Sequence, residues 1–298
     1  MYDVCVRFNA IVDSYYQYEI PTTLNLENKQ IAPQQVQLLA NALQYNKTFT
    51  SIDISRNQIN DQGIQHFANT LQKNKTLSIL NLTNNNIHEH GAQYLANGLQ
   101  ENKILTILNF GYNQIGDQGA KYFADVLEYN ETLIEIDLSA NRIGNSGLRD
   151  LGNALQKNKT LKTIHLGFNE IGDDGVKHLA DASQQNKTLI TLDLQWNRVN
   201  NYGAQYLANA LRQNKTLLKL DLYENQIGFS GALYLADALQ ENTVILSYLS
   251  YKLLIRLSID YFIQTLTELN LEYNPIGNDG KESLGKILQN NSEIKIFF

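Results

Sequence analysis

The chain has 298 residues, a net charge of −6 at pH 7, one cysteine and 36 asparagines. Asparagine suits neither helix interiors nor strands, so this excess predicts many caps and turns or else disorder. The 17 tyrosines and 10 phenylalanines argue against disorder. The single cysteine excludes a disulfide framework or a structural zinc site. A pI near 5.4 disfavours nucleic acid as a partner.

Residues 1–23 show no regular pattern, and we expect them to form an irregular N-terminal cap or the stub of a longer array. Met1 to Ala10 lack the basic start and the apolar run of a secretory signal. The sequence therefore predicts a cytoplasmic protein.

A unit of 28 residues then repeats without a slip, with starts from Ile52 to Leu220. Its first part alternates apolar and polar residues, as in Leu192-Asp193-Leu194, which predicts a short strand with one buried face. Its second part, such as 203–211, has apolar residues at helical spacing and predicts an amphipathic helix.

A degenerate copy of the unit begins at Leu24, and a late copy begins at Leu269. No unit can bury its apolar face alone, so the units must stack into an α/β solenoid. We expect regular repeats over 24–243 and the last repeat with the C-terminal end over 265–298.

When the repeats are aligned, three positions of the unit hold polar residues in nearly every copy. The first follows the strand and consists of Asn57, Asn85, Asn113, Asn141, Asn169, Asn197, Asn225 and Asn274. The second is expected to supply helix N-caps and consists of Asp61, Asp117, Asn145, Asp173, Asn201 and Asn278. The third is expected to end each helix in a left-handed turn and consists of Asn46, Asn74, Asn102, Asn130, Asn158, Asn186, Asn214 and Asn242.

The pattern Leu-x-x-Leu-x-Leu-x-x-Asn-x-Ile, followed by a helix, resembles the ribonuclease-inhibitor-like class of leucine-rich repeats. With its Ile-Gly-x-x-Gly-Ala, Leu-Ala-x-Ala-Leu and Asn-x-Thr-Leu segments, the unit is most similar to the repeat region of NOD-like receptors, over about Leu24 to Asn291. The resemblance implies a right-handed α/β horseshoe with a parallel sheet on the concave side and helices on the convex side. It also implies that the asparagines that follow the strands form a structural ladder, with amides bonded to the backbone of neighbouring turns.

Two features break the pattern. Ser183 stands where the other helices place a leucine, which predicts a local weak point, because losing a core leucine costs about 2 to 5 kcal/mol. After Thr243 the next unit starts 21 residues late, and removal of 244–264 restores the Asn-x-Thr-Leu junction.

The apolar segment 244–264 has two explanations. It is either a real insertion between a helix and the next strand, or a retained intron, since it starts with Val (codons GT…) and ends with Gln (one codon …AG). Its charges at Lys252, Arg256 and Asp260 disfavour a membrane span.

We find no motif for catalysis, a metal ion or a cofactor. His88 and His90 form only a His-x-His without a carboxylate or cysteine cluster, and Gly144-Asn145-Ser146-Gly147 has the wrong spacing for a nucleophile elbow. We expect a protein that is no enzyme, holds no metal and needs no cofactor.

A binding surface is the better prediction. Residues that flank the buried strand positions point to the concave side, and several there are aromatic or charged. Aromatic and arginine side chains are the usual anchors of protein interfaces. The predicted site is centred on Phe168, Trp196 and Tyr223, and its further members are Tyr112, Arg142, His165, Asp193, Arg198, Asp221 and Tyr273.

The alternative is that these rings only stack on one another along the solenoid edge. The sequence thus predicts a non-catalytic scaffold or recognition module for a protein partner, like the repeats of NOD-like receptors. Ran GTPase-activating proteins also have a similar solenoid, which would instead make a small GTPase the partner, although their functional residues have no match here. Fold alone does not choose among partners.

Overall fold

The computed structural model describes residues 22–239, 266–290 and 294–298. The apolar segment 244–264 and most of the expected N-terminal cap lie outside these described residues. The strands are β1 (Thr23–Asn25), β2 (Ser51–Asp53), β3 (Ile79–Asn81), β4 (Ile107–Asn109), β5 (Glu135–Asp137), β6 (Thr163–His165), β7 (Thr191–Asp193), β8 (Lys219–Asp221), β9 (Glu268–Asn270) and β10 (Lys295–Phe297). The helices are α2 (Pro33–Leu43), α3 (Asn60–Lys73), α4 (Glu89–Gln100), α5 (Gly116–Leu127), α6 (Asn145–Lys157), α7 (Asp173–Gln185), α8 (Asn201–Gln213) and α10 (Gly277–Asn290), with a further helix at 229–239.

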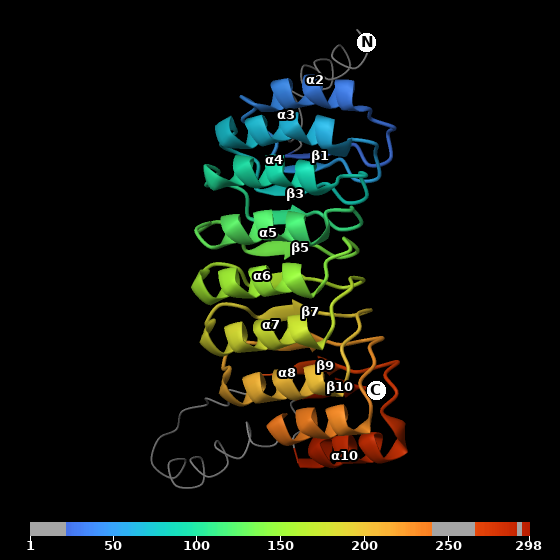
Figure 1. The fold of residues 1–298 in the computed structure, drawn as a ribbon. Coiled ribbons are helices and arrows are strands. Elements are labelled where there is room, and N and C mark those ends of the chain that lie inside the picture. The colour runs from blue at the N-terminus through green and yellow to red at the C-terminus, as the bar shows by residue number, and fades with distance from the viewer. Residues whose placement is uncertain (1–21, 240–265, 291–293) are drawn as a thin grey trace, which may run out of the picture.

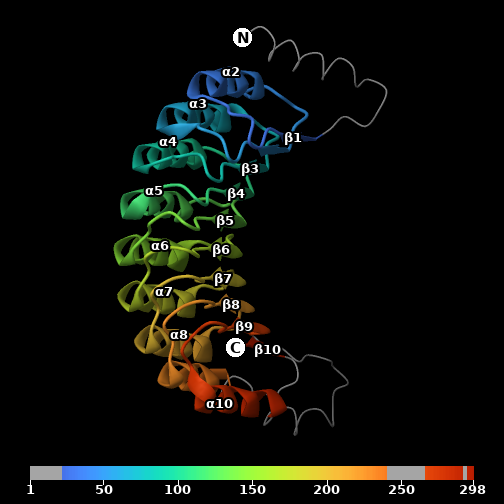
Figure 2. The same ribbon diagram turned by 90° about the vertical axis from the view of Figure 1, so that its right-hand side faces the viewer.

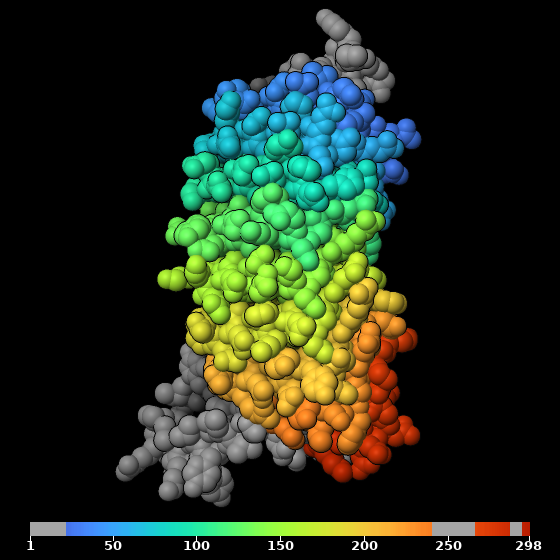
Figure 3. Space-filling view, in the orientation of Figure 1, coloured from blue at the N-terminus to red at the C-terminus, as the bar shows by residue number. Residues whose placement is uncertain are grey.

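The ten strands form one parallel sheet in chain order, β1 to β10. Equivalent residues of successive units face each other, for example Leu192 opposite Leu220. The strands lie on the concave side of a curved stack and the helices on its convex side (Figures 1 and 2). Seen from the helix side, consecutive repeats cover the surface as bands in chain order (Figure 3). The predicted α/β solenoid is confirmed.

The core lies between the sheet and the helices. Strand residues such as Leu192 and Leu194 and helix residues such as Leu207 and Ala208 are at most 3% exposed. Neighbouring helices pack closely, since a Cβ added at Gly98 of α4 would lie 2.7 Å from the carbonyl oxygen of Ala68 in α3. One continuous apolar core therefore runs through all described repeats.

The asparagines that follow the strands form the ladder that the resemblance implied. At Asn113 the side-chain amide donates to the carbonyl oxygens of Leu82 and Phe110, at 3.2 and 3.0 Å. Its Oδ1 accepts from the N–H groups of Asn85 and Ile87 in the preceding repeat, at 3.0 and 3.1 Å. The ladder asparagines thus pair backbone groups that would otherwise be buried without partners, although the buried Oδ1 of Asn141 has no partner.

The predicted N-caps act on a different helix from the one expected. Asp173 is the first residue of α7, and its Oδ1 accepts from the N–H groups of Asn200 and Gly203 at the start of α8, at 2.8 and 3.0 Å. Asp117 serves α6 in the same way. The prediction of a local cap was wrong because the next helix start, one repeat away, lies closer to these carboxylates than their own.

The asparagines that end the helices do not adopt the left-handed turn that we expected. Asn158 has φ −63° and ψ 137°, an extended conformation. Its Oδ1 accepts from the N–H groups of Thr160 and Leu161, and its amide donates to the carbonyl oxygen of Leu127 in the preceding repeat. The side chain, rather than the backbone conformation, satisfies the groups freed at the helix end.

Ser183 is 8% exposed, and its hydroxyl donates to the carbonyl oxygen of Ala180 at 2.8 Å. The hydroxyl is therefore satisfied, and a weak point at this helix stays a prediction. Further along the chain, β8 pairs directly with β9, with Leu220 opposite Leu269. The sheet is continuous across the position where the sequence departs from its period.

Candidate protein-binding surface

The position before each ladder asparagine has a left-handed backbone in every described repeat. The φ angles lie between 51° and 57° at Asn28, Arg56, Asn84, Tyr112, Ala140, Phe168, Trp196, Glu224 and Tyr273. For residues other than Gly and Asn this conformation costs roughly 1 to 2 kcal/mol. The turn imposes it, since the Trp196 N–H donates to the carbonyl oxygen of Tyr223 in the next repeat at 2.8 Å. The backbone therefore gives no reason for a bulky ring at this position.

Five aromatic rings meet along this edge of the sheet, and we call Tyr112, Phe168, Trp196, Tyr223 and Tyr273 the ring ladder. Phe168 and Trp196 stack with centroids 5.2 Å apart and planes at 13°. Tyr223 lies 6.2 Å from Trp196 and 5.0 Å from Tyr273. Tyr112 reaches Phe168 at 6.3 Å although they are two repeats apart, because Ala140 between them carries only a methyl group.

The ring ladder is exposed as well as stacked. The exposed fractions are 42% for Phe168, 43% for Trp196, 53% for Tyr112 and 72% for Tyr273. Stacking covers the ring faces that Phe168 and Trp196 turn toward each other, while their edges remain accessible. The result is an apolar stripe across the repeats of β4 to β9, and such stripes are typical of interaction sites.

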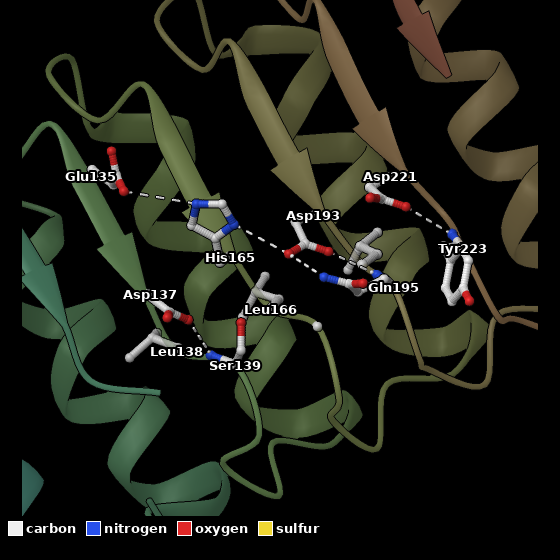
Figure 4. A network of polar contacts seen from close by, with 12 residues as sticks. Glu135, Asp137, Leu138, Ser139, His165, Leu166, Asp193, Gln195, Asp221 and Tyr223 are labelled. Atoms are coloured by element: carbon white, nitrogen blue, oxygen red, sulfur yellow. Dashed lines mark hydrogen bonds and ion pairs between the residues drawn. The ribbon is translucent and has the colours of Figure 1, made fainter. Parts of the chain in front are cut away.

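A row of charged residues crosses the concave face beside the ring ladder. Asp137, His165, Asp193 and Asp221 end four consecutive strands and lie opposite one another in register. His165 lies between two carboxylates, with Nδ1 3.2 Å from Oδ2 of Asp193 and Nε2 3.9 Å from Oε1 of Glu135 (Figure 4). The hydrogen bond to Asp193 raises the pKa of His165, against the opposing effect of burial.

Asp221 stands at the other end of the row. Its Oδ1 accepts the N–H of Tyr223 at 2.9 Å. Burial raises the pKa of Asp221, and the nearby charge of Asp193 adds to this. The row is therefore a site of partly buried negative charge.

The two arginines of the predicted site lie elsewhere. They follow the ladder asparagines, in the turns that lead to the helices, and the guanidinium of Arg198 pairs with Glu170 at 3.3 Å. Arg142 is exposed and has φ 60°. The cation–π contacts in the described part of the chain involve neither arginine. The structure thus brings together the rings and the charged row, without Arg142 and Arg198.

Four residues of this surface were missed from the sequence. One is Asp137, which ends β5 at the position that His165 and Asp193 occupy in their strands and could have been found from the period. Glu135 faces His165 from the neighbouring strand, Gln195 donates its amide to Asp193 at 3.2 Å, and Ala140 leaves room for Tyr112 to meet Phe168. Glu135 could have been found as the strand residue two before Asp137, on the same face. The other two depend on side-chain contacts that the repeat pattern does not encode.

Within the described ranges, no cluster of three or more His, Cys, Asp or Glu side chains is arranged as a metal site. Nor does any helix among these residues have the length and apolar character needed to cross a membrane.

Comparison with known proteins agrees with the repeat. The family described as Leucine Rich repeat matches eight segments, residues 45–68, 73–96, 101–124, 129–152, 157–180, 185–208, 213–236 and 263–285. No curated protein matches the chain. Among solved structures, the chain is similar to actin-binding site 2 of leiomodin-1, with 19% identity, a TM-score of 0.42, and coverage of 56% of this chain and 96% of that one. On the matched repeats, which span more than half of its length, this chain belongs to the leucine-rich repeat family.

Proposed function

We propose that the chain is a non-catalytic recognition module that binds a protein partner on the ring ladder and the adjoining concave face. Leucine-rich repeats imply a protein–protein interaction module. The observation that supports this particular surface is the ring ladder itself. Trp196, Phe168 and Tyr112 occupy a left-handed position that disfavours them, yet they remain about half exposed. Since the turn imposes this backbone in every described repeat without calling for a ring, the exposed rings themselves support an interaction site.

The resemblance of the unit to NOD-like receptor repeats extends this proposal to recognition in the cytoplasm. The charged row contributes orientation and specificity rather than most of the affinity, because polar groups across an interface select partners and apolar anchors hold them.

The test is capture of partners by the intact chain, compared with Trp196→Ala and Phe168→Ala and quantified by mass spectrometry. Truncation of a central aromatic anchor is expected to reduce the specific partners about tenfold or more. Tyr202→Ala is the matched control, because Tyr202 is 67% exposed on the helix side. Thermal melts establish that each variant is folded.

Undiminished capture by folded Trp196→Ala and Phe168→Ala proteins would contradict the proposal. Stimulation of GTP hydrolysis by a small GTPase would instead support the GTPase-activating alternative.

A further inference from the structure

In seven of the described strands the last residue makes the same local turn, whether it is an amide or a carboxylate. Its Oδ1 accepts the N–H two residues later at Asn25, Asn81 and Asn270, and equally at Asp53, Asp137, Asp193 and Asp221. Asparagine serves this turn as well as aspartate. The fold therefore needs an acceptor here but not a negative charge.

Three of the carboxylates nevertheless cluster on neighbouring strands beside the ring ladder. β5, β7 and β8 end in aspartate, and Glu135 adds a further carboxylate on the same face, whereas β4 and β9 end in asparagine and Asp53 of β2 lies apart from this cluster. Asp193 is only 7% exposed and lies next to Asp221, so their charges repel each other at close range. An amide at either position would avoid both the repulsion and the loss of hydration.

Cations of this protein compensate only part of the charge. His165 lies against Asp193 and Glu135, and Lys219 pairs with Glu268 at 3.1 Å. Within the described ranges no ion pair reaches Asp137 or Asp221, although His165 lies opposite Asp137 and is attracted by its charge. The row thus keeps negative charge that the fold does not require and only partly neutralises.

The charged row and the ring ladder form one surface. Tyr223 links them, because its N–H donates to Asp221 while its ring contacts Trp196 and Tyr273. A ligand lying across these strands would meet carboxylates on one side and ring edges on the other. Phe168 and Trp196 stack face to face, so the faces between these two rings are closed to a cation.

We propose that this surface binds a basic segment of the partner protein, with lysine or arginine head groups at the half-buried Asp137 and Asp221 and apolar side chains along the ring ladder. The proposal rests on the proposed function and names the chemistry of its partner. Long basic side chains suit this surface, because they place a charged head on the carboxylates while their aliphatic stems cover the ring edges. The acidic net charge of the chain would also speed their approach.

The probes are three fluorescein-labelled synthetic peptides in which leucine alternates with lysine, with serine or with glutamate. Fluorescence anisotropy with the full chain is expected to show binding of the lysine peptide that weakens as salt is raised to about 0.5 M. The serine and glutamate peptides are expected to bind at least about tenfold more weakly.

Two charge variants separate local recognition from bulk attraction. Asp221→Asn keeps the turn and should weaken the lysine peptide about fivefold. Asp125→Asn removes the same charge from an exposed position on α5 and should change affinity by less than about twofold. Trp196→Ala should weaken the binding of each peptide whose leucine side chains contact the ring ladder.

Lysine-peptide binding weaker than about 1 mM, binding no tighter than that of the serine peptide, or equal losses in Asp221→Asn and Asp125→Asn would each overturn the basic-segment proposal. If peptide binding still falls in Trp196→Ala, the proposed function survives such a result. The proposed function falls as well only if folded Trp196→Ala and Phe168→Ala proteins also capture partners undiminished.

Discussion

His165 lies between acidic side chains of the two strands beside it. Asp193 accepts or shares its Nδ1 proton at 3.2 Å, and Glu135 lies 3.9 Å from Nε2. Both contacts favour the protonated ring, and the hydrogen bond to Asp193 is the largest cause of its raised pKa. Because protonation is stronger in the folded state, the stability that this contact contributes is full below the ordinary histidine pKa of about 6.5 and is lost as pH rises through the raised pKa.

This contact gives a prediction at the residue scale. Asp193→Asn should lower the pKa of His165, because the amide carries no charge to stabilise the imidazolium. The stabilisation that protonated His165 contributes above about pH 6.5 should therefore become smaller. The measurement is an NMR titration of the His165 ring, together with urea unfolding at several pH values.

Asp181→Asn, at an exposed position on α7, is the control and should leave the His165 titration unchanged. An unchanged His165 pKa in Asp193→Asn would mean that Asp193 is not its partner in solution.

At the scale of the element, the starts of α4, α6, α7, α8 and the helix at 229–239 depend on the repeat before them. The carboxylate of Asp173 reaches the N–H groups of Asn200 and Gly203 at the start of α8. A Cβ added at Gly203 would lie 2.5 Å from Oδ1 of Asp173, so a glycine at this position permits the close approach. The pairing explains why acidic and amide residues recur at the start of the helices.

Asp173→Ala should therefore destabilise the protein by about 1 kcal/mol, as for loss of an N-cap. The effect should appear in the next repeat, as faster hydrogen exchange at the Asn200 and Gly203 amides. Asp174→Ala is the matched control, because Asp174 is exposed in the same helical turn and shares any effect of the helix dipole. Equal exchange rates in the two variants would show that Asp173 does not cap α8.

For the whole molecule, the sheet continues from β8 to β9 despite the longer sequence between them. The Thr267 N–H donates to the carbonyl oxygen of Leu218 at 2.8 Å, and Asn274 donates to that of Leu222 at 2.8 Å. These are the contacts that other neighbouring repeats make. The packing of the last repeat therefore follows the period of the solenoid rather than the spacing in the sequence.

Deletion of residues 244–264 should leave the solenoid folded. The connection to β9 would then have the length of the one between α5 and β5, and closing a shorter connection should stabilise the protein by about 1 kcal/mol. Thermal unfolding should show an equal or higher midpoint. Deletion of the equally long segment 155–175 is the control and should prevent folding, since it breaks the register of the repeats. A marked fall in the midpoint without 244–264 would show that the segment contributes to the fold.

The sequence was sufficient to predict the architecture because one pattern, repeated at a fixed period, sets both strand and helix. Alternation at Leu192-Asp193-Leu194 and helical spacing at 203–211 each predict an element that the structure contains. It also predicted that Phe168, Trp196 and Tyr223 would be neighbours, because equivalent positions of adjacent strands face each other.

Contacts that cross from one repeat to the next were harder to predict. The cap made by Asp173 joins residues 27 and 30 positions apart, and the pattern within one unit gives no sign of it. The pairing of Arg198 with Glu170 also joins two repeats, 28 positions apart. Such details arise from side-chain conformations, which periodicity does not specify.

The ladder asparagines bond to the repeat before their own, whereas the capping residues bond to the repeat after their own. Asn113 satisfies backbone groups of the repeat before it, whereas Asp117 satisfies the helix start of the repeat after it. Each repeat thus obtains its turn from downstream and its helix start from upstream. The smallest independent structural unit is therefore a pair of neighbouring repeats. Truncation of the array between two repeats removes bonds on both sides. The repeat before the break loses the bonds to its turn, and the helix after the break loses its N-terminal cap.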